Sequence, residues 1–436
     1  MLFIAFQANG QEKKEEVPEV KTGWTFGALP AITFDSDLGF QYGALVTIFD
    51  FGDGSTYPEY RHSLYLEVSR FTKGTGFNRF YYDSYYLLNE VRVTADVSYL
   101  TEQALQFYGF NGYQAVYNPN FENSDHPDYI SRLFYSHQRN MFRVMLNFQG
   151  HFIKGDRRLR WITGLAMHDI DVGSIDLERL NRGQSASDKL PEVPTLYDKY
   201  VEWGVLKGKE VEGNRTTYLK AGIAYDNRDN EPHPFKGMWS EAVVSTAPNF
   251  LGNGDYSYSK LTLFHRQYFT VISKKLSAAY RLGYQGTLSG RVPFHMQPHL
   301  VTSTMTGTYA EGLGGSRTLR GILRNRVVGE DFILANAELR WKFFKTYLFK
   351  QHFYVATNLF YDTGKITRSI NLDLSGVLES EKDNFFSDAN EVFHHSAGLG
   401  LKFAMNENFI VSCDYGRAFD RRDGSSGLYI GLNFLY

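Results

Sequence analysis

The sequence predicts an all-β protein that forms a single sixteen-stranded antiparallel transmembrane β-barrel. Its 436 residues include 35 Phe, 30 Tyr and 5 Trp, yet the mean hydropathy is −0.36. A chain that is aromatic-rich but polar on average is typical of a barrel whose strands face lipid on one side and a wet lumen on the other. The hydrophobic period is two over most of the chain, as β-strands require. No run of about 18 apolar residues occurs, so no membrane-spanning helix is predicted.

Charge and cysteine content exclude several classes of protein. Lys and Arg number 46 against 48 Asp and Glu, so the chain lacks the basic excess that nucleic-acid binding requires. The only cysteine, Cys413, rules out an intramolecular disulfide framework and a zinc cluster of cysteines. Motifs for a serine hydrolase, a zinc protease or a phosphate-binding loop are not found. We therefore predict no enzyme activity, no catalytic or metal-binding residue and no cofactor.

The N-terminal segment is typical of the signal peptide of an exported protein. "MLFIAFQANGQ" has a short apolar run followed by small and polar residues, and we interpret it as a signal peptide shortened by start-site choice. The alternative is a disordered mature N-terminus. "EKKEEVPEVK" follows and is typical of a solvated tether. The predicted organisation is a leader remnant and short periplasmic tether at 1–22, then a barrel at 23–436.

Alternation of apolar and polar residues locates the strands. In "FILANAELRWKF", Ala337, Leu339 and Trp341 share one face, whereas Glu338 and Arg340 share the other. Charges in the middle of a strand favour a wet lumen over the packed core of a soluble sandwich, because a buried unpaired charge is costly. The predicted strands are 23–34, 39–51, 59–71, 78–89, 91–101, 134–152, 158–171, 215–228, 237–248, 256–270, 276–287, 330–346, 351–363, 392–404, 408–417 and 427–436.

The connections between these strands alternate in length, and this alternation orients the barrel. Long connections lie at 102–133, 172–214, 288–329 and 364–391, and short ones lie between them. Short periplasmic turns alternating with long outer loops are the pattern of outer-membrane barrels. Both chain ends are therefore expected on the periplasmic side.

Five motifs in the second half of the chain resemble the BamA/TamA outer-membrane assembly superfamily, the bacterial surface antigen barrels. They occur in the order that the family shows. The motifs are "YDNRDNEPHPFKG" at 225–237, "TLRGI" at 318–322, "NAELRW" at 336–341, "FYDTG" at 360–364 and "YIGLNFLY" at 429–436.

The resemblance implies that the sixth outer loop folds back into the lumen, where its arginine meets acids of the barrel wall. We refer to the expected contact set as the loop lock: Arg320, Gly321, Glu338, Asp362 and Gly364. Alternation independently predicts that Glu338 and Asp362 point inward. A guanidinium inside a barrel needs carboxylate partners, which it binds in bidentate geometry. Two roles stay open for Arg320: it holds the loop in place, or it sets the position of a gate.

The resemblance also implies a C-terminal β-signal at Gly431, Phe434 and Tyr436, with the two rings facing lipid. Pro30 lies in the first strand and has no N–H for a β-ladder, so it indicates either a local bulge or a weak seam between the first and last strands. We expect Trp24–Phe26 beside Phe434–Tyr436 across that seam.

Two weaker patterns have simple interpretations. The pair His394 and His395 is expected on a loop surface rather than at a metal ion. Asp35 and Asp37 are expected in a hydrated outer turn rather than at a calcium ion.

The expected function follows from the resemblance: insertion or translocation of proteins or lipids at the outer membrane of a Gram-negative bacterium. The family's periplasmic POTRA domains have no counterpart in residues 1–22, so we expect a short POTRA-less member. Expected partners are outer-membrane lipids and lipopolysaccharide, client proteins and a separate periplasmic subunit, but no nucleic acid. The alternatives are a passive diffusion pore and a barrel-embedded hydrolase.

Overall fold

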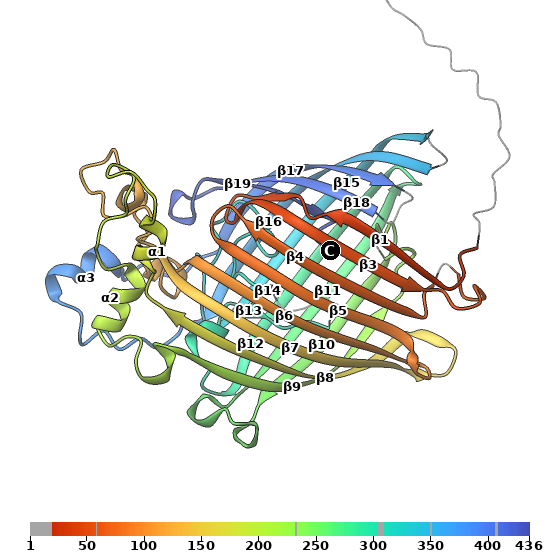
Figure 1. Cartoon of the computed structure of the whole chain (residues 1–436), viewed down its shortest axis with the longest axis horizontal. Helices are drawn as coiled ribbons and strands as arrows, with labels where there is room; N and C mark the ends of the chain where they lie inside the picture. The colour runs from red at the N-terminus through yellow and green to blue at the C-terminus, as the bar shows by residue number, and fades with distance from the viewer. Residues whose placement is uncertain (1–19, 58, 232, 304–308, 349–350, 406–408) are drawn as a thin grey trace, which may run out of the picture.

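The computed structural model describes residues 20–57, 59–231, 233–303, 309–348, 351–405 and 409–436. Within these residues, one large antiparallel sheet closes on itself to form a barrel (Figure 1). The predicted leader, apart from residues 20–22, lies outside the described residues. None of the described helices is long and apolar enough to span a bilayer.

The barrel strands follow one another around the sheet in chain order, apart from the closing seam. The strands of the first half are β1 (Trp24–Pro30), β2 (Thr33–Asp35), β3 (Gly39–Asp50), β4 (His62–Phe71), β5 (Thr75–Leu88), β6 (Val91–Gln106), β7 (Ser136–Ile153), β8 (Asp156–Gly173) and β9 (Gly213–Asp226). The strands of the second half are β10 (Gly237–Ala247), β11 (Tyr258–Ile272), β12 (Leu276–Gly290), β15 (Asp331–Leu348), β16 (Gln351–Arg368), β17 (His394–Met405), β18 (Phe409–Ala418) and β19 (Ser426–Leu432).

The prediction of sixteen strands is confirmed. The sheet contains seventeen strand segments, but β1 and β2 lie in line against the same neighbour, β3, and together make one barrel strand. Every predicted span overlaps an observed strand. Most differ by a few residues at their ends, and the last strand stops at Leu432, four residues before the end of the predicted span.

Side chains alternate between the lumen and the lipid-facing surface, which explains why these residues form strands. On β15, Asn336, Glu338 and Arg340 are buried in the barrel interior. Their neighbours Leu339 and Trp341 are exposed on the outer wall, at 43% and 52%. The apolar wall is stabilised by contact with lipid, and the inward charges are neutralised by partners across the lumen.

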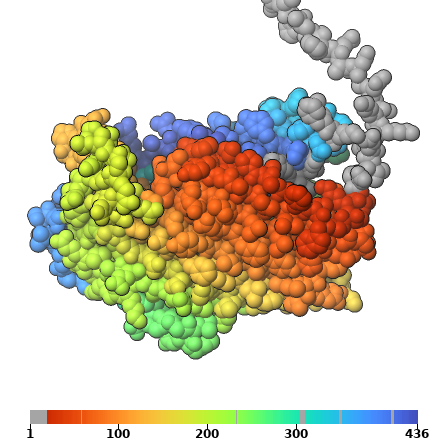
Figure 2. Space-filling model, viewed as in Figure 1, coloured from red at the N-terminus to blue at the C-terminus, as the bar shows by residue number. Residues whose placement is uncertain are grey.

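The long outer loops gather into a dome over one end of the barrel. It carries the helices α1 (Leu177–Asn181), α2 (Leu196–Glu202) and α3 (Glu379–Phe385), all at the same end in Figure 1. The loops also crowd together in the space-filling view (Figure 2). A cluster of buried aromatic rings, among them Phe107, Phe134, Tyr200, Trp203 and Phe294, holds the dome together and packs on the barrel mouth. Burial of these large rings stabilises a cover that the loop backbone alone would not maintain.

Candidate functional site

The sixth outer loop, residues 291–330, enters the barrel. It contains a short hairpin of β13 (His299–Leu300) and β14 (Tyr309–Ala310). Beyond the hairpin, the apolar side chains of the loop are fully buried against the inner wall at Phe332, Leu334 and Ile366. These loop residues are Leu313, Leu319, Ile322 and Val327. Burial of this apolar set fixes the loop inside the lumen.

Arg320 lies at the centre of the loop lock. Its Nε donates to Asp362 Oδ2 at 2.9 Å and its Nη2 donates to Asp362 Oδ1 at 3.0 Å, a bidentate pair. Its Nη1 lies 2.7 Å from Glu338 Oε1. The guanidinium also stacks on Phe360, with Cζ 3.6 Å from the ring centre. Arg320 is 1% exposed, so two carboxylates and an aromatic face replace its hydration shell.

Glu338 connects the loop to the C-terminal segment. Its second oxygen accepts a hydrogen bond from Arg340 Nε at 2.7 Å. Arg340 Nη2 in turn donates to the backbone oxygen of Tyr436 at 2.7 Å, and the guanidinium lies 4.4 Å from the ring centre of Phe434. A continuous chain of contacts therefore runs from the tip of the sixth loop to the last residues of the chain.

Two glycines allow the loop backbone to touch the wall. Gly321 has a φ of +93°, which disfavours a side chain, and a Cβ there would lie 2.5 Å from the carbonyl carbon of Gly416 on β18. A Cβ on Gly416 would lie 2.5 Å from the carbonyl oxygen of Arg320. At Gly364 a Cβ would lie 3.0 Å from the carbonyl oxygen of Ile333. The loop tip and β18 can therefore approach this closely because each has a glycine at the contact, Gly321 in the loop and Gly416 in the strand.

Sequence reasoning missed two further arginine anchors of the same loop. Arg324 Nη2 donates to Glu102 Oε1 at 2.9 Å, and the other oxygen of Glu102 accepts from Arg139 Nε at 2.7 Å. Arg326 is 1% exposed and donates to the backbone oxygens of Gly112, Ala115 and Arg422 in other outer loops. Three arginines of one loop therefore bind three different parts of the structure.

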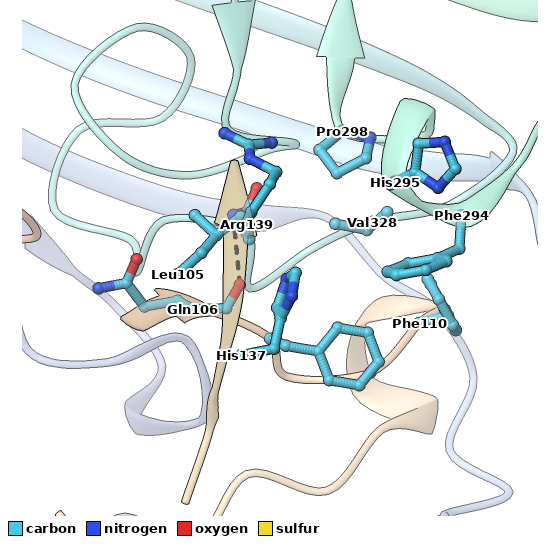
Figure 3. Close-up of a pocket in the computed structure, with 12 residues that line it drawn as sticks. Leu105, Gln106, Phe110, His137, Arg139, Phe294, His295, Pro298 and Val328 are labelled. Atoms are coloured by element: carbon cyan, nitrogen blue, oxygen red, sulfur yellow. Dashed lines mark hydrogen bonds between the residues drawn. The ribbon is translucent and has the colours of Figure 1, made fainter. Parts of the chain in front are cut away.

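A small cavity lies beneath the dome beside the second anchor. His137 and Arg139 of β7 line it together with Phe294 and His295 of the sixth loop (Figure 3). Phe110 of the third outer loop also contributes to the lining. Its lining therefore combines aromatic rings of the dome with Arg139 of the ionic network.

The closing seam of the barrel is short. Only two residue pairs join β19 to β2, Tyr429 with Asp35 and Ile430 with Phe34. Hydrogen bonds between Ser36 and Leu428 extend the contact by one position. By comparison, seven residue pairs join β18 to β19. Within the described residues, β1 pairs with β3 alone, so its other edge is unpaired.

The expectation that Phe434 and Tyr436 face lipid is wrong. The chain turns at Asn433, whose φ is +66°, and the strand alternation ends there. Phe434 and Tyr436 enter the lumen and are only 6% and 9% exposed. Phe434 packs on His233 with the ring centres 4.6 Å apart. The attraction of the buried cations for the aromatic faces explains why the rings turn inward. Gly431 stays in the ladder opposite Ser412.

The expected pairing of Trp24–Phe26 with Phe434–Tyr436 is also wrong. The observed pair Asp35–Tyr429 sets a register in which Trp24–Phe26 lies beyond the last residue of the sequence. Pro30 pairs with Ala44 of β3 and ends β1, and the closing pairs occur after it, in β2. The first strand therefore extends farther toward the periplasm than β19 does.

Two minor expectations need correction. His394 does not lie on a loop surface: it is fully buried at the start of β17, with Nδ1 2.7 Å from Asp423 Oδ1 and Nε2 3.0 Å from Glu391 Oε1. Asp37 is buried at 8% exposure, whereas its neighbours Asp35 and Ser36 are half-buried, so hydration of the turn does not extend to Asp37. Burial, together with the nearby charge of Asp35, raises the pKa of Asp37 to about 7. In the described part of the chain, no group of three or more His, Cys or acidic side chains is arranged to hold a metal ion.

A closed barrel with an apolar outer wall and a loop folded into its lumen defines an integral outer-membrane β-barrel protein. The chain belongs to the Omp85 superfamily, whose domain matches residues 61–434. It is accordingly a protein of the outer membrane of a Gram-negative bacterium.

Two solved structures share the fold. BamA from Haemophilus ducreyi lacking POTRA domains 1-3 aligns with a TM-score of 0.53 at 15% sequence identity, over 95% of this chain and 71% of that one. CdiB from Escherichia coli aligns with a TM-score of 0.56 at 12% identity, over 96% of this chain and 64% of that one. At these identities the likeness shows the fold alone. No curated protein sequence matches the chain.

Proposed function

We propose that this protein inserts or translocates client proteins or lipids at the outer membrane, and that clients leave the barrel sideways through the seam between β2 and β19. The observation that carries the proposal is the contrast between a two-pair seam and a lumen filled from the outer side by the sixth loop and the dome. Within the described residues, passage along the barrel axis would need several buried ion pairs to break. Opening the seam needs only a few hydrogen bonds to break.

The unpaired edge of β1 supports the same proposal. Residues Trp24–Pro30 pair with β3 on one side, and none of the residues that the structure describes forms a ladder with their other side. An unpaired strand edge is a template on which another strand can add. A client strand that pairs there would extend the wall of the barrel at the seam.

The loop lock connects the sixth outer loop to the C-terminal segment, which follows the seam strand β19. Because Glu338 binds both Arg320 and Arg340, a movement of the loop tip changes the partners available to the C-terminal segment. A continuous network of packed and ion-paired side chains that has two arrangements can carry coupling between distant sites. In this proposal the protein is not an enzyme, and its partners are outer-membrane lipids, client proteins and a periplasmic subunit that delivers them.

A cysteine cross-link across the seam tests the proposal. Phe34→Cys and Ile430→Cys are introduced together in a Cys413→Ser background, because Phe34 and Ile430 are directly paired and such Cβ atoms lie about 4.5–5.5 Å apart. Oxidation in the native host should lower the outer-membrane level of client proteins or lipids, measured by quantitative mass spectrometry of outer-membrane fractions. Reductant should restore those levels.

A matched control places the cross-link away from the seam. Leu401→Cys with the native Cys413 joins β17 to β18 at a registered pair, and it should have no effect when oxidised. Unchanged client levels with a fully oxidised seam would overturn sideways release. Ion conductance of the cross-linked barrel in a planar bilayer would instead indicate a diffusion pore.

A further inference from the structure

Three neighbouring strands carry nitrogen-bearing side chains that face outward near the outer end of the barrel. They are Lys365 on β16, His395 on β17 and Arg417 on β18, and we call them the basic patch. Asp362, Gly364 and Ile366 are buried on the inner face of β16, so Lys365 lies on the outer face. His395 pairs with Thr363, and Arg417 pairs with Ala397, which places the three side chains within a few rungs of one another.

The cations of the patch lack acidic partners. Within the described residues, neither Lys365 nor Arg417 forms an ion pair. Lys365 Nζ instead lies 5.8 Å from the ring centre of Phe393. His395 Nδ1 lies 2.6 Å from the hydroxyl of Tyr361, which orients the imidazole on the outer face. Cations on a lipid-facing wall are destabilising without an anion, so this surface is complementary to an anionic headgroup.

An apolar groove of about 510 Å³ lies on the same wall next to the patch and crosses β11, β12, β15 and β16. Its floor is low because Ala278 and Ala337 have short side chains. Larger side chains border it: Phe269, Tyr280, Leu339 and Leu359. Tyr361 lines the groove and also binds His395, and it pairs directly with Ala337. The groove and the basic patch are therefore parts of one continuous surface.

We propose that this surface binds one anionic glycolipid of the outer leaflet, with its phosphates on the basic patch and an acyl chain in the groove. Charge complementarity selects the headgroup, and the apolar floor selects the chain. The patch lies at the outer ends of its strands, at the same end as the dome, and so faces the outer leaflet. The site is separate from the seam and depends on the outer-membrane location alone.

Lipid binding to the purified full-length chain in detergent tests the proposal. Bisphosphorylated lipid A, phosphatidylglycerol and phosphatidylcholine are titrated separately, and bound lipid is measured by native mass spectrometry together with the shift in Tm. Lipid A should bind at least about tenfold more tightly than either phospholipid. Inorganic phosphate alone should leave the Tm unchanged.

Variants separate the two halves of the site. Replacing Lys365, His395 and Arg417 together by Gln should weaken lipid A binding about tenfold and leave the Tm of the lipid-free protein unchanged. Ala337→Trp should fill the groove floor and weaken lipid A binding without changing the patch. Lys154→Gln with Lys275→Gln removes two exposed cations from periplasmic turns and should bind lipid A like the parent.

Three outcomes would overturn the site. They are equal lipid A binding by the patch variant and the parent, phosphatidylglycerol binding as tight as that of lipid A, and a Tm shift reproduced by inorganic phosphate. None of these outcomes bears on the seam, because the seam cross-link is measured on client levels.

Discussion

Arg320 of the sixth outer loop and Asp362 of the barrel wall are joined by two parallel side-chain hydrogen bonds, and the backbone N–H of Arg320 donates a third to the same carboxylate. Both side chains are at most 1% exposed. A buried ion pair adds little to the free energy of unfolding compared with apolar side chains of similar volume. Removal of one partner is costly, however, because it leaves a buried charge unpaired. The contact therefore specifies where the loop sits more than it raises the stability of the barrel.

Arg320→Ala should reduce stability by roughly 3–5 kcal/mol, because the carboxylates of Asp362 and Glu338 lose their shared partner. The measurement is the temperature at which the folded band converts to the unfolded band in a heat-modifiability gel. Arg158→Ala removes an exposed pair with Asp156 and should leave that temperature unchanged, because exposed ion pairs contribute little to stability. If Arg320→Ala resists heat as well as Arg158→Ala, Arg320 does not anchor the loop.

Gly416→Ala should release the tip of the sixth loop without removing any charge. The new Cβ would meet the carbonyl oxygen of Arg320 at 2.5 Å, which is closer than real Cβ atoms approach. Trypsin should then cleave after Arg320 or Arg324, both buried in the parent. Gly173→Ala, where the structure has open space, is the control. Protection of both arginines in the Gly416 variant would refute the backbone contact.

Deletion of Leu435 and Tyr436 should block assembly of the barrel, because the segment carries the predicted β-signal and its aromatic packing. Arg340→Ala should have a smaller effect: it frees the backbone oxygen of Tyr436 and one face of Phe434 but keeps the signal sequence. The amounts of both variants in outer-membrane fractions distinguish the two effects. Parental amounts of the deletion variant would contradict the β-signal.

His394→Ala should loosen the contact between the seventh and eighth outer loops. His394 bonds both Glu391 and Asp423, and its removal leaves each carboxylate with one hydrogen bond fewer, at a cost of about 1–3 kcal/mol. Hydrogen exchange of residues 420–424 should speed up. His126→Ala, on an exposed loop, should leave that exchange unchanged. Identical exchange in both variants would show that His394 is dispensable.

The dome should lose stability as the pH rises toward alkaline values. Burial raises the pKa of Glu122 from its ordinary value of 4.5 to about 7. A raised pKa in the folded state means that the contribution is complete below pH 4.5 and is lost as the pH rises through 7. The protection factors of the amides of residues 118–135, which are exchange rates corrected for the base catalysis of exchange itself, should therefore be higher at acidic than at alkaline pH. Glu122→Gln should remove this difference, and a persistent difference would assign it to another group.

The barrel itself could be predicted from the sequence because the period of two acts on every strand. Charged residues such as Glu338 and Asp362 alternate with apolar residues along their strands, so their inward direction follows from alternation alone. The sequence does not place Glu102 in a strand, because the fifth predicted strand ends at residue 101, whereas the observed strand, β6, continues to Gln106. Its bond to Arg324 joins residues 222 positions apart, which no local pattern encodes.

In the C-terminal segment, the alternation of residues along the sequence no longer predicts which way the side chains point. Alternation places Phe434 outside, but Asn433 adopts a left-handed backbone and reverses the direction of the residues after it. The position of Phe434 depends on cations from distant strands, Arg340 and Lys402. His394 was misplaced for a similar reason, since its two acidic partners lie in different loops.

The two pairs of the seam also set the dimensions of the whole barrel. The number of strands is sixteen, but tilt and diameter depend as well on the shear, the offset that accumulates around the sheet. That offset is fixed only where the sheet meets itself, at Asp35–Tyr429 and Phe34–Ile430. A slip of two residues there would keep every side chain on its own face, since facing repeats every second residue. The same slip would alter the tilt of every strand, so the shortest ladder in the molecule determines the width of its lumen.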